Sequence, residues 1–119
     1  MKWNLDKKRP LCPQICEQIC VWIAKEILKT GERLPSVREL ALQAGVNPNT
    51  IQHSLEGLET QGILYSVRGS GWFVADDATP AQQTVEKLIL EKTATFFAEM
   101  NALGLDESQT KNYVKEFLL

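Results

Sequence analysis

The sequence contains no apolar run that approaches the ~18 residues needed to span a membrane, although apolar residues make up 44% of the chain. It also shows no signal peptide, because residues 1–5 lead directly into charged residues and no small-residue cleavage site follows an apolar segment. The length fits one ordinary domain, or a small domain with an appendage. We therefore expect a cytoplasmic protein without a membrane partner.

Catalytic and cofactor-binding signatures are also missing. His53 is the one histidine, and no carboxylate and nucleophile accompany it at a spacing typical of a catalytic site. The chain has no Walker glycine loop, no dinucleotide-binding fingerprint and no cluster of His, Cys and Asp with metal-ligand spacing. We expect neither an enzymatic activity nor a bound cofactor or metal.

Cysteine is scarce, and the three residues Cys12, Cys16 and Cys20 follow one another at intervals of four. On a helix their span rises ~12 Å, so three thiolates cannot converge on one ion with bonds of ~2.3 Å. Their β-carbons also lie beyond the ~4 Å that a disulfide prefers. We interpret the cysteines as small buried or half-buried side chains. A regulatory thiol is the alternative, because Cys12 lies at a helix start, where a thiolate is favoured.

A net charge of −2 offers little general attraction for nucleic acid, but the charges are unevenly distributed. Residues 1–75 contain nine Lys or Arg and seven Asp or Glu, a net +2, whereas residues 76–119 contain four and eight, a net −4. Local positive patches suffice where phosphates pass, and an acidic tail can point away. Lys7, Lys8 and Arg9 either contact a phosphate or belong to a solvated, flexible end.

A first helix is predicted over residues 13–29, since Pro13 fits a first helical turn and Thr30 and Gly31 end the pattern. Its core-facing stripe recurs at helical spacing and consists of Ile15, Ile19, Trp22, Ile23 and Ile27. Ahead of this helix, Trp3 is expected to pack on the body of the domain or on a partner subunit.

Two short amphipathic helices separated by a tight turn are predicted in residues 34–64. Ser36 and Glu39 have the spacing of a capping box and predict a helix over residues 36–44. Gly45 then permits the left-handed conformation of a helix C-cap.

The second of these helices begins with Asn47 as N-cap and Pro48 at the first helical position, and ends near Gly62. Its apolar side chains share one face: Ile51, Leu55 and Leu58. The opposite face carries many amide, hydroxyl and imidazole groups of the kind that read bases: Asn49, Thr50, Gln52, His53, Glu56 and Thr60. This pattern favours a DNA-binding helix-turn-helix over an ordinary helical hairpin within a core.

A β-hairpin is predicted next, because residues 63–67 alternate between apolar and polar and residues 72–75 are again rich in β-formers. Between them, Gly69 and Gly71 permit the turn and a close approach of the backbone to a phosphate or a groove floor. We interpret Trp72 as a core residue; the alternative is stacking near the sugar–phosphate chain.

A polar linker and two further helices complete the chain. One helix is predicted from Thr79 and Pro80 to Gly104, and the last follows Asp106 as its cap. The two helices carry more large apolar side chains than they can cover by folding on each other, and exposed patches of this kind mark an interface.

Four motifs in register resemble the GntR family of bacterial transcription regulators: LPSVRELA, GVNPNTI, LEGLETQGIL and RGSGWFV. The NPNT form and the short tail are similar to its YtrA-like branch. The resemblance implies a mainly α fold with a small β-hairpin, in which a winged helix-turn-helix DNA-binding domain (residues 1–76) precedes a two-helix dimerisation tail (residues 77–119). It also implies a homodimer, joined through the C-terminal helices, that binds a double-stranded DNA operator. The residues do not indicate whether a small-molecule effector exists.

In the family, the arginine of LPSxRE contacts the DNA backbone and a basic residue tips the wing, which implies these roles for Arg38 and Arg68. An ion pair with Glu39 or Glu32 is the alternative for Arg38, and Arg33 is a weaker candidate for the phosphate contact. An amide can bond an adenine edge in two places, which suits the polar start of the second helix. The predicted DNA-binding set is Ser36, Arg38, Asn47, Asn49, Thr50, Gln52, His53, Arg68 and Gly69.

The sequence departs from the family at Pro48 and Gln52, where many members have arginine. This departure argues against guanine-reading contacts and favours an A·T-leaning site. We expect a transcription repressor whose dimer reads a pseudo-palindrome with half-sites about one helical turn apart. The alternatives are a winged-helix protein-interaction module and a regulator that responds to thiol or metal chemistry through the cysteines.

Overall fold

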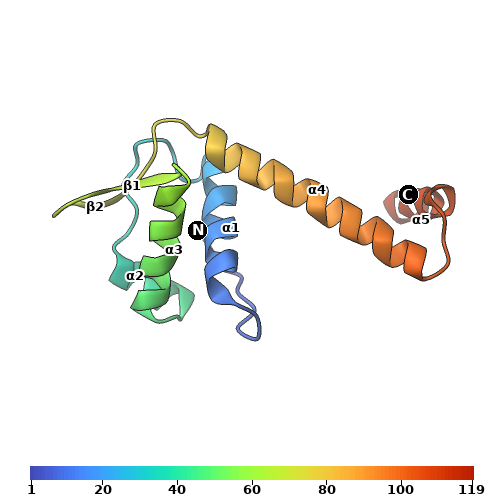
Figure 1. Cartoon of the computed structure of the whole chain (residues 1–119), viewed down its shortest axis with the longest axis horizontal. Helices are drawn as coiled ribbons and strands as arrows, with labels where there is room; N and C mark the ends of the chain where they lie inside the picture. Colours follow the sequence, from blue (N-terminus) through green and yellow to red (C-terminus); the bar gives the residue numbers. More distant parts are fainter. The chain divides into compact units, whose positions relative to one another are not determined.

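The computed structural model describes all residues from Met1 to Leu119 (Figure 1). Five helices and one antiparallel hairpin follow in the order α1 (Leu11–Ala24), α2 (Val37–Ala44), α3 (Pro48–Thr60), β1 (Leu64–Val67), β2 (Gly71–Val74), α4 (Thr79–Ala102) and α5 (Glu107–Leu118). The predicted fold class, mainly helical with one small hairpin, is confirmed. The chain forms two compact units, Met1–Val85 and Glu86–Leu119, so the boundary lies inside α4.

The core of the first unit lies between α1, α3 and the hairpin, and α1 and α3 lie side by side (Figure 1). Because apolar residues recur at helical spacing on α1 and α3, each helix can turn one face inward. The most completely buried of these side chains are Ile15, Ile19, Ile51 and Leu55. Ala81, in the first turn of α4, is buried in the same core.

The prediction for the first helix was wrong at its end, because α1 stops at Ala24 instead of residue 29. Glu26 adopts φ 61°, in the left-handed region that ends a right-handed helix. The reversal turns Ile27 outward, where it is 49% exposed, and buries Leu28 in its place. Ile27 is therefore not part of the core stripe. The backbone N–H groups of both residues donate to the carbonyl oxygen of Trp22, which stabilises the reversal.

The turn between α2 and α3 follows its predicted chemistry. Ser36 Oγ accepts from the N–H of Glu39 at 3.1 Å, but no reciprocal bond from the Glu39 side chain is formed, so the capping box is half complete. Gly45 adopts φ 68° as the C-cap of α2. Asn47 Oδ1 accepts from the N–H of Asn49 at 2.8 Å and caps α3.

The hairpin pairs Leu64 with Val74 and Val67 with Gly71, and its strands agree with the predicted ranges to within a residue. Trp72 is buried, which confirms its prediction as a core residue. The backbone at Arg33 pairs with Phe73 on the outer edge of β2, so the α1–α2 linker acts as a short third strand.

The amino-terminal segment is fastened to the first unit at several points, although Lys7, Lys8 and Arg9 are exposed. The Trp3 ring packs edge-on against Trp22 with centroids 4.6 Å apart, which confirms that Trp3 packs on the body of the domain. Gln14 Oε1 accepts from the N–H of Asp6 at 2.7 Å. Lys7 Nζ donates to the carbonyl oxygen of Gly45 at 2.6 Å, and so ties the segment to the turn.

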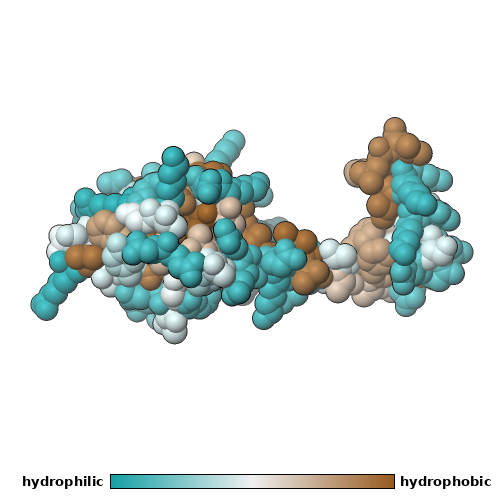
Figure 2. Space-filling view, turned by 90° about the horizontal axis from the view of Figure 1, so that it is seen from above, coloured by the Kyte–Doolittle hydropathy of each residue, from teal (hydrophilic) through white to brown (hydrophobic).

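The second unit contains the end of α4 and all of α5. Asp106 caps α5 as predicted, in a complete capping box with Gln109. Thr110 is the one buried residue in this unit, and apolar side chains lie on its surface (Figure 2). None of the helices combines the length and apolarity that crossing a membrane requires.

Candidate nucleic-acid interface

The amino-terminal half of α3 presents a polar face to solvent. Asn49, Gln52 and His53 are exposed and Thr50 is half-buried. Asn47, just before the helix, is also exposed, although its side chain is occupied in capping. The apolar face of the helix is fully covered, since Ile51, Leu55 and Leu58 are at most 1% exposed. The core therefore fixes the direction in which the polar face points.

Two cysteine thiols join α1 to α3. Cys12 Sγ lies 3.7 Å from the carbonyl oxygen of Thr50, and Cys16 Sγ lies 3.4 Å from that of Ser54, and both thiols can donate to these oxygens. Burial raises the pKa of Cys16 to about 11 and that of Cys20 to about 12. These two thiols therefore stay protonated at neutral pH, and they pack as small core side chains.

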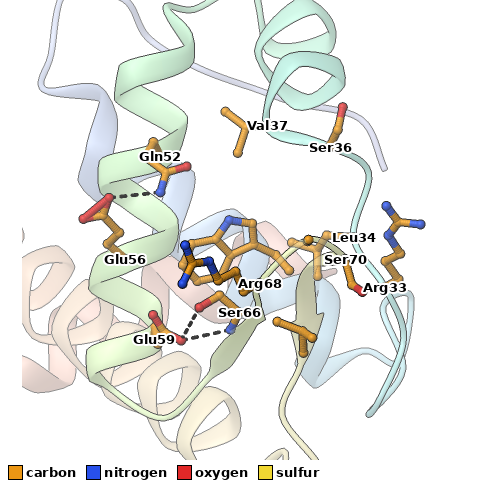
Figure 3. Close-up of a pocket in the computed structure, with 14 residues that line it drawn as sticks. Arg33, Leu34, Ser36, Val37, Gln52, Glu56, Glu59, Ser66, Arg68 and Ser70 are labelled. Atoms are coloured by element: carbon orange, nitrogen blue, oxygen red, sulfur yellow. Dashed lines mark hydrogen bonds between the residues drawn. The ribbon is translucent and has the colours of Figure 1, made fainter.

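A groove of about 600 Å³ separates α3 from the hairpin, which we call the wing (Figure 3). Gln52, Glu56 and Glu59 line it from α3, and the wing contributes Arg68 and other residues. Ser66 and Ser70 also line the groove, on the side of the wing (Figure 3). Polar side chains thus lie on both walls of the groove, among apolar ones such as Val37 and Val67.

One carboxylate fastens the wing to α3. Glu59 Oε2 accepts from the N–H of Ser66 at 2.9 Å and from its hydroxyl at 2.8 Å (Figure 3). These two bonds set the position of β1 against the carboxyl-terminal half of the helix. Sequence reasoning missed this contact, because nothing in the local sequence tells which turn of α3 the strand meets.

Three exposed arginines come from the wing, from α2 and from the α1–α2 linker. Arg68 is exposed at the wing, and Arg38 is exposed on α2. Arg38 forms no ion pair with Glu39 or Glu32, so the alternative role considered for it is absent from the structure. Arg33, the weaker candidate for a phosphate contact, also lines the groove, with Nε 3.5 Å from the place where a Cβ on Gly71 would lie.

The remaining predicted contacts lie at the rim. Ser36 lines the groove, and its oxygen caps α2 while the hydroxyl hydrogen is still available for donation. Gly69 adopts φ 80° at the tip of the wing, and a Cβ at this position would meet nothing within 4 Å, so the tip is open to solvent. Four predicted residues thus meet in one groove: Ser36, Gln52, Arg68 and Gly69. The other five lie outside it: Arg38, Asn47, Asn49, Thr50 and His53.

A helix-turn-helix whose second helix shows a polar face beside a β-hairpin defines the winged helix-turn-helix class. The sequence profile of the family described as "Bacterial regulatory proteins, gntR family" matches residues 12–74. The chain belongs to this GntR family of transcription regulators.

Two curated relatives from Bacillus subtilis match along most of the chain. The "Uncharacterized HTH-type transcriptional regulator YhcF" is 38% identical over 96% of this chain and 94% of its own length. The "HTH-type transcriptional repressor YtrA" is 32% identical over 90% and 83%, in agreement with the resemblance to the YtrA-like branch.

Solved structures show the same fold. A GntR family transcriptional regulator from Listeria monocytogenes superposes with a TM-score of 0.83 at 34% identity, covering 94% of this chain and 98% of that one. The DNA-binding domain of AraR, in complex with operator ORX1, has a TM-score of 0.55 at 36% identity, covering 63% of this chain and 92% of that one.

Proposed function

We propose that this protein is a sequence-specific transcription repressor that binds a pseudo-palindromic DNA operator as a homodimer. The observation that carries the proposal is the exposed polar face of α3, held outward by a fully buried apolar face on the same helix. A helix of this kind fits the major groove, where base edges differ in their donors and acceptors. The similar DNA-binding domain of AraR forms a complex with an operator, which supports DNA as the ligand. The similar protein YtrA is a transcriptional repressor, which supports repression.

The DNA contacts divide by chemistry. Asn49, Thr50 and Gln52 read base edges, with Asn47 and His53 beside them at the start of the helix. Neutral amide and hydroxyl groups suit an A·T-leaning site, because the chain places no arginine on α3 for guanine.

The phosphate contacts come from the flanks of α3. Arg38 and Ser36 hold the register from α2 through phosphates, which position the protein without specifying a sequence. Arg68 reaches the flanking minor groove from the wing, and Gly69 lets the wing backbone approach closely.

The homodimer is proposed to form through the second unit. Its helices expose large apolar side chains, among them Leu103, Tyr113, Phe117 and Leu118. A monomer rarely leaves so many apolar groups in water, whereas a second copy covers them. A homodimer carries two α3 helices. Binding of both helices to the two halves of an operator gives a higher overall affinity than one helix alone.

The test begins with selection of bound duplexes from a randomised DNA pool, followed by measurement of binding by fluorescence anisotropy over a range of salt concentrations. Arg38→Ala should weaken binding on every sequence and reduce the salt slope by about one per protomer. Gln52→Ala should instead lose about 1–3 kcal/mol of preference at one base pair. Lys25→Ala, a change to an exposed cation at the far end of α1, is the matched control.

Two results would count against the proposal. If no duplex is enriched, the protein does not read DNA sequence. If Arg38→Ala and Gln52→Ala lose affinity equally on all sequences, the division between positioning and reading is wrong.

A further inference from the structure

The side chain of Gln52 is held by a neighbour one helical turn further along α3. Its Nε2 donates to Glu56 Oε1 at 3.0 Å (Figure 3). Both residues are exposed and both line the groove beside the wing. Residues four apart lie on the same face of a helix, so Glu56 meets Gln52 on the side of α3 that is free for a ligand.

The chemistry of this contact fixes the orientation of the Gln52 amide. A carboxylate can only accept, so Gln52 must turn its amide nitrogen toward Glu56 and its carbonyl oxygen away. The terminal torsion of a glutamine side chain is broad and nearly two-fold, so a free Gln52 would present either end of its amide. Glu56 therefore selects one of two arrangements of donor and acceptor.

The selected arrangement leaves one N–H and the carbonyl oxygen of Gln52 unused in the free protein. The major-groove edge of adenine offers an acceptor at N7 beside a donor at N6, which matches this pair of groups. The reverse arrangement of the amide would face each of these atoms with a group of the wrong kind. The orientation of Gln52 thus bears directly on which base it accepts.

The charge of Glu56 does not explain its presence on this face, since a carboxylate repels phosphates. The other carboxylate on the same wall, Glu59, has a separate task in holding Ser66 of the wing. Glu56 makes its one side-chain hydrogen bond with Gln52.

We infer that Glu56 is a positioning residue that holds the Gln52 amide in the orientation that reads adenine. This inference rests on the proposed function, because it requires α3 to meet base edges. Glu56 acts through Gln52 and does not contact the base itself.

The experiment is a cycle of four variants of the full chain: Gln52→Ala, Glu56→Ala, Glu56→Gln and the double variant Gln52→Ala/Glu56→Ala. The probes are the duplex selected by the wild-type protein from the randomised pool and the duplex changed at the base pair that is most sensitive to Gln52→Ala. The ratio of the two dissociation constants measures discrimination at that pair. Circular dichroism of each variant monitors the helix.

Glu56→Ala should reduce discrimination about three- to tenfold, because the amide then samples both orientations. Glu56→Gln keeps the length of the side chain, but its amide can donate as well as accept and no longer forces one orientation of Gln52, so this variant should also reduce discrimination. In the Gln52→Ala background, Glu56→Ala should change discrimination no further. Loss of the carboxylate charge should raise affinity for all duplexes similarly in both Glu56 variants, so this effect cancels in the ratio.

Three results would overturn the inference. In the first, Glu56→Ala leaves discrimination unchanged, as a purely helix-stabilising pair would. In the second, it lowers discrimination equally in the Gln52→Ala background, so that Glu56 itself reads the base. In the third, Gln52→Ala affects no single base pair. Failure of the proposed function is a different outcome, in which the wild-type protein enriches no duplex at all.

Discussion

The two compact units of this chain differ in where they keep their apolar side chains. Every buried apolar residue lies in Met1–Val85, whereas Glu86–Leu119 buries Thr110 alone. In the second unit Leu103, Phe117 and Leu118 are between 75% and 88% exposed. Both units contain helices with side-chain N-caps, α2 and α3 in the first and α5 in the second, so the difference lies mainly in packing.

This difference in burial predicts that the first unit can fold alone and that the second unit cannot. Most helix stability in proteins comes from burial of an amphipathic face, whereas a helix cap contributes only about 1 kcal/mol. We therefore expect the first unit to be stable alone and the second to depend on association.

Truncation after Val85 should yield a folded monomer whose affinity for a two-part operator falls by about 100-fold or more, because the second reading helix is no longer tethered. Truncation after Asp77 should be less stable, since it also removes Ala81 from the core. Sedimentation velocity and anisotropy give the two readouts. A fragment of residues 1–85 that still sediments as a tight dimer would show that the second unit is not the association element.

Leu55→Ala should destabilise the first unit by about 2–5 kcal/mol, because Leu55 is fully buried and its removal leaves a cavity. Phe117→Ser, at a residue 88% exposed, should leave the urea unfolding of the first unit unchanged and weaken dimerisation. Unfolding and sedimentation of the full-length variants measure both effects. If Phe117→Ser associates as strongly as the wild-type protein, the exposed apolar side chains of the second unit do not serve association.

Alkaline pH should reduce the stability of the first unit through its buried thiols. The pKa of Cys16 is raised from 9.0 to about 11 and that of Cys20 to about 12, mainly by burial. The unfolded thiols therefore ionise first, and stability that is present below pH 9 is lost as pH rises toward these folded values. By pH 11 we expect a loss of roughly 3 kcal/mol, most of it from the buried Cys20, because the contribution of the half-buried Cys16 is reduced by solvent screening.

The measurement for this prediction is urea unfolding between pH 8 and pH 11, compared with Cys16→Ala/Cys20→Ala. The variant carries its own cavity penalty, so the informative quantity is the change in stability with pH. Parallel curves for the two proteins would mean that the thiols ionise equally in the folded and unfolded states.

Local features of this fold could be predicted from the sequence because their causes lie within a few residues. The Ser36 and Asn47 caps, the left-handed Gly45 and the start of α3 at Pro48 each depend on side-chain and backbone chemistry of the immediate neighbours. The hairpin could be predicted for the same reason, because its turn residues lie between two β-rich runs.

Features set by tertiary contacts could not be predicted. The helical pattern continues through Ile27, and α1 ends earlier because Leu28 enters the core and the following linker pairs with the edge of β2. Likewise, the contact between Glu59 and Ser66 depends on how the hairpin packs on α3. At the site, the sequence predicts which residues of α3 face outward. It does not predict that Glu56 orients the Gln52 amide, because that contact depends on the positions of the two side chains.

Sequence reading by α3 can be tested directly by following the backbone amide resonances of the full chain while the selected operator duplex is added. We predict the largest shifts at Asn47, at residues 49–53 and at the wing tip around Arg68 and Gly69, with smaller ones near Arg38. A scrambled duplex should shift Arg38 and Arg68 while leaving the amides of Asn49 and Gln52 nearly unchanged. Shifts concentrated on the exposed face of α1, with α3 unaffected by the operator, would contradict this prediction.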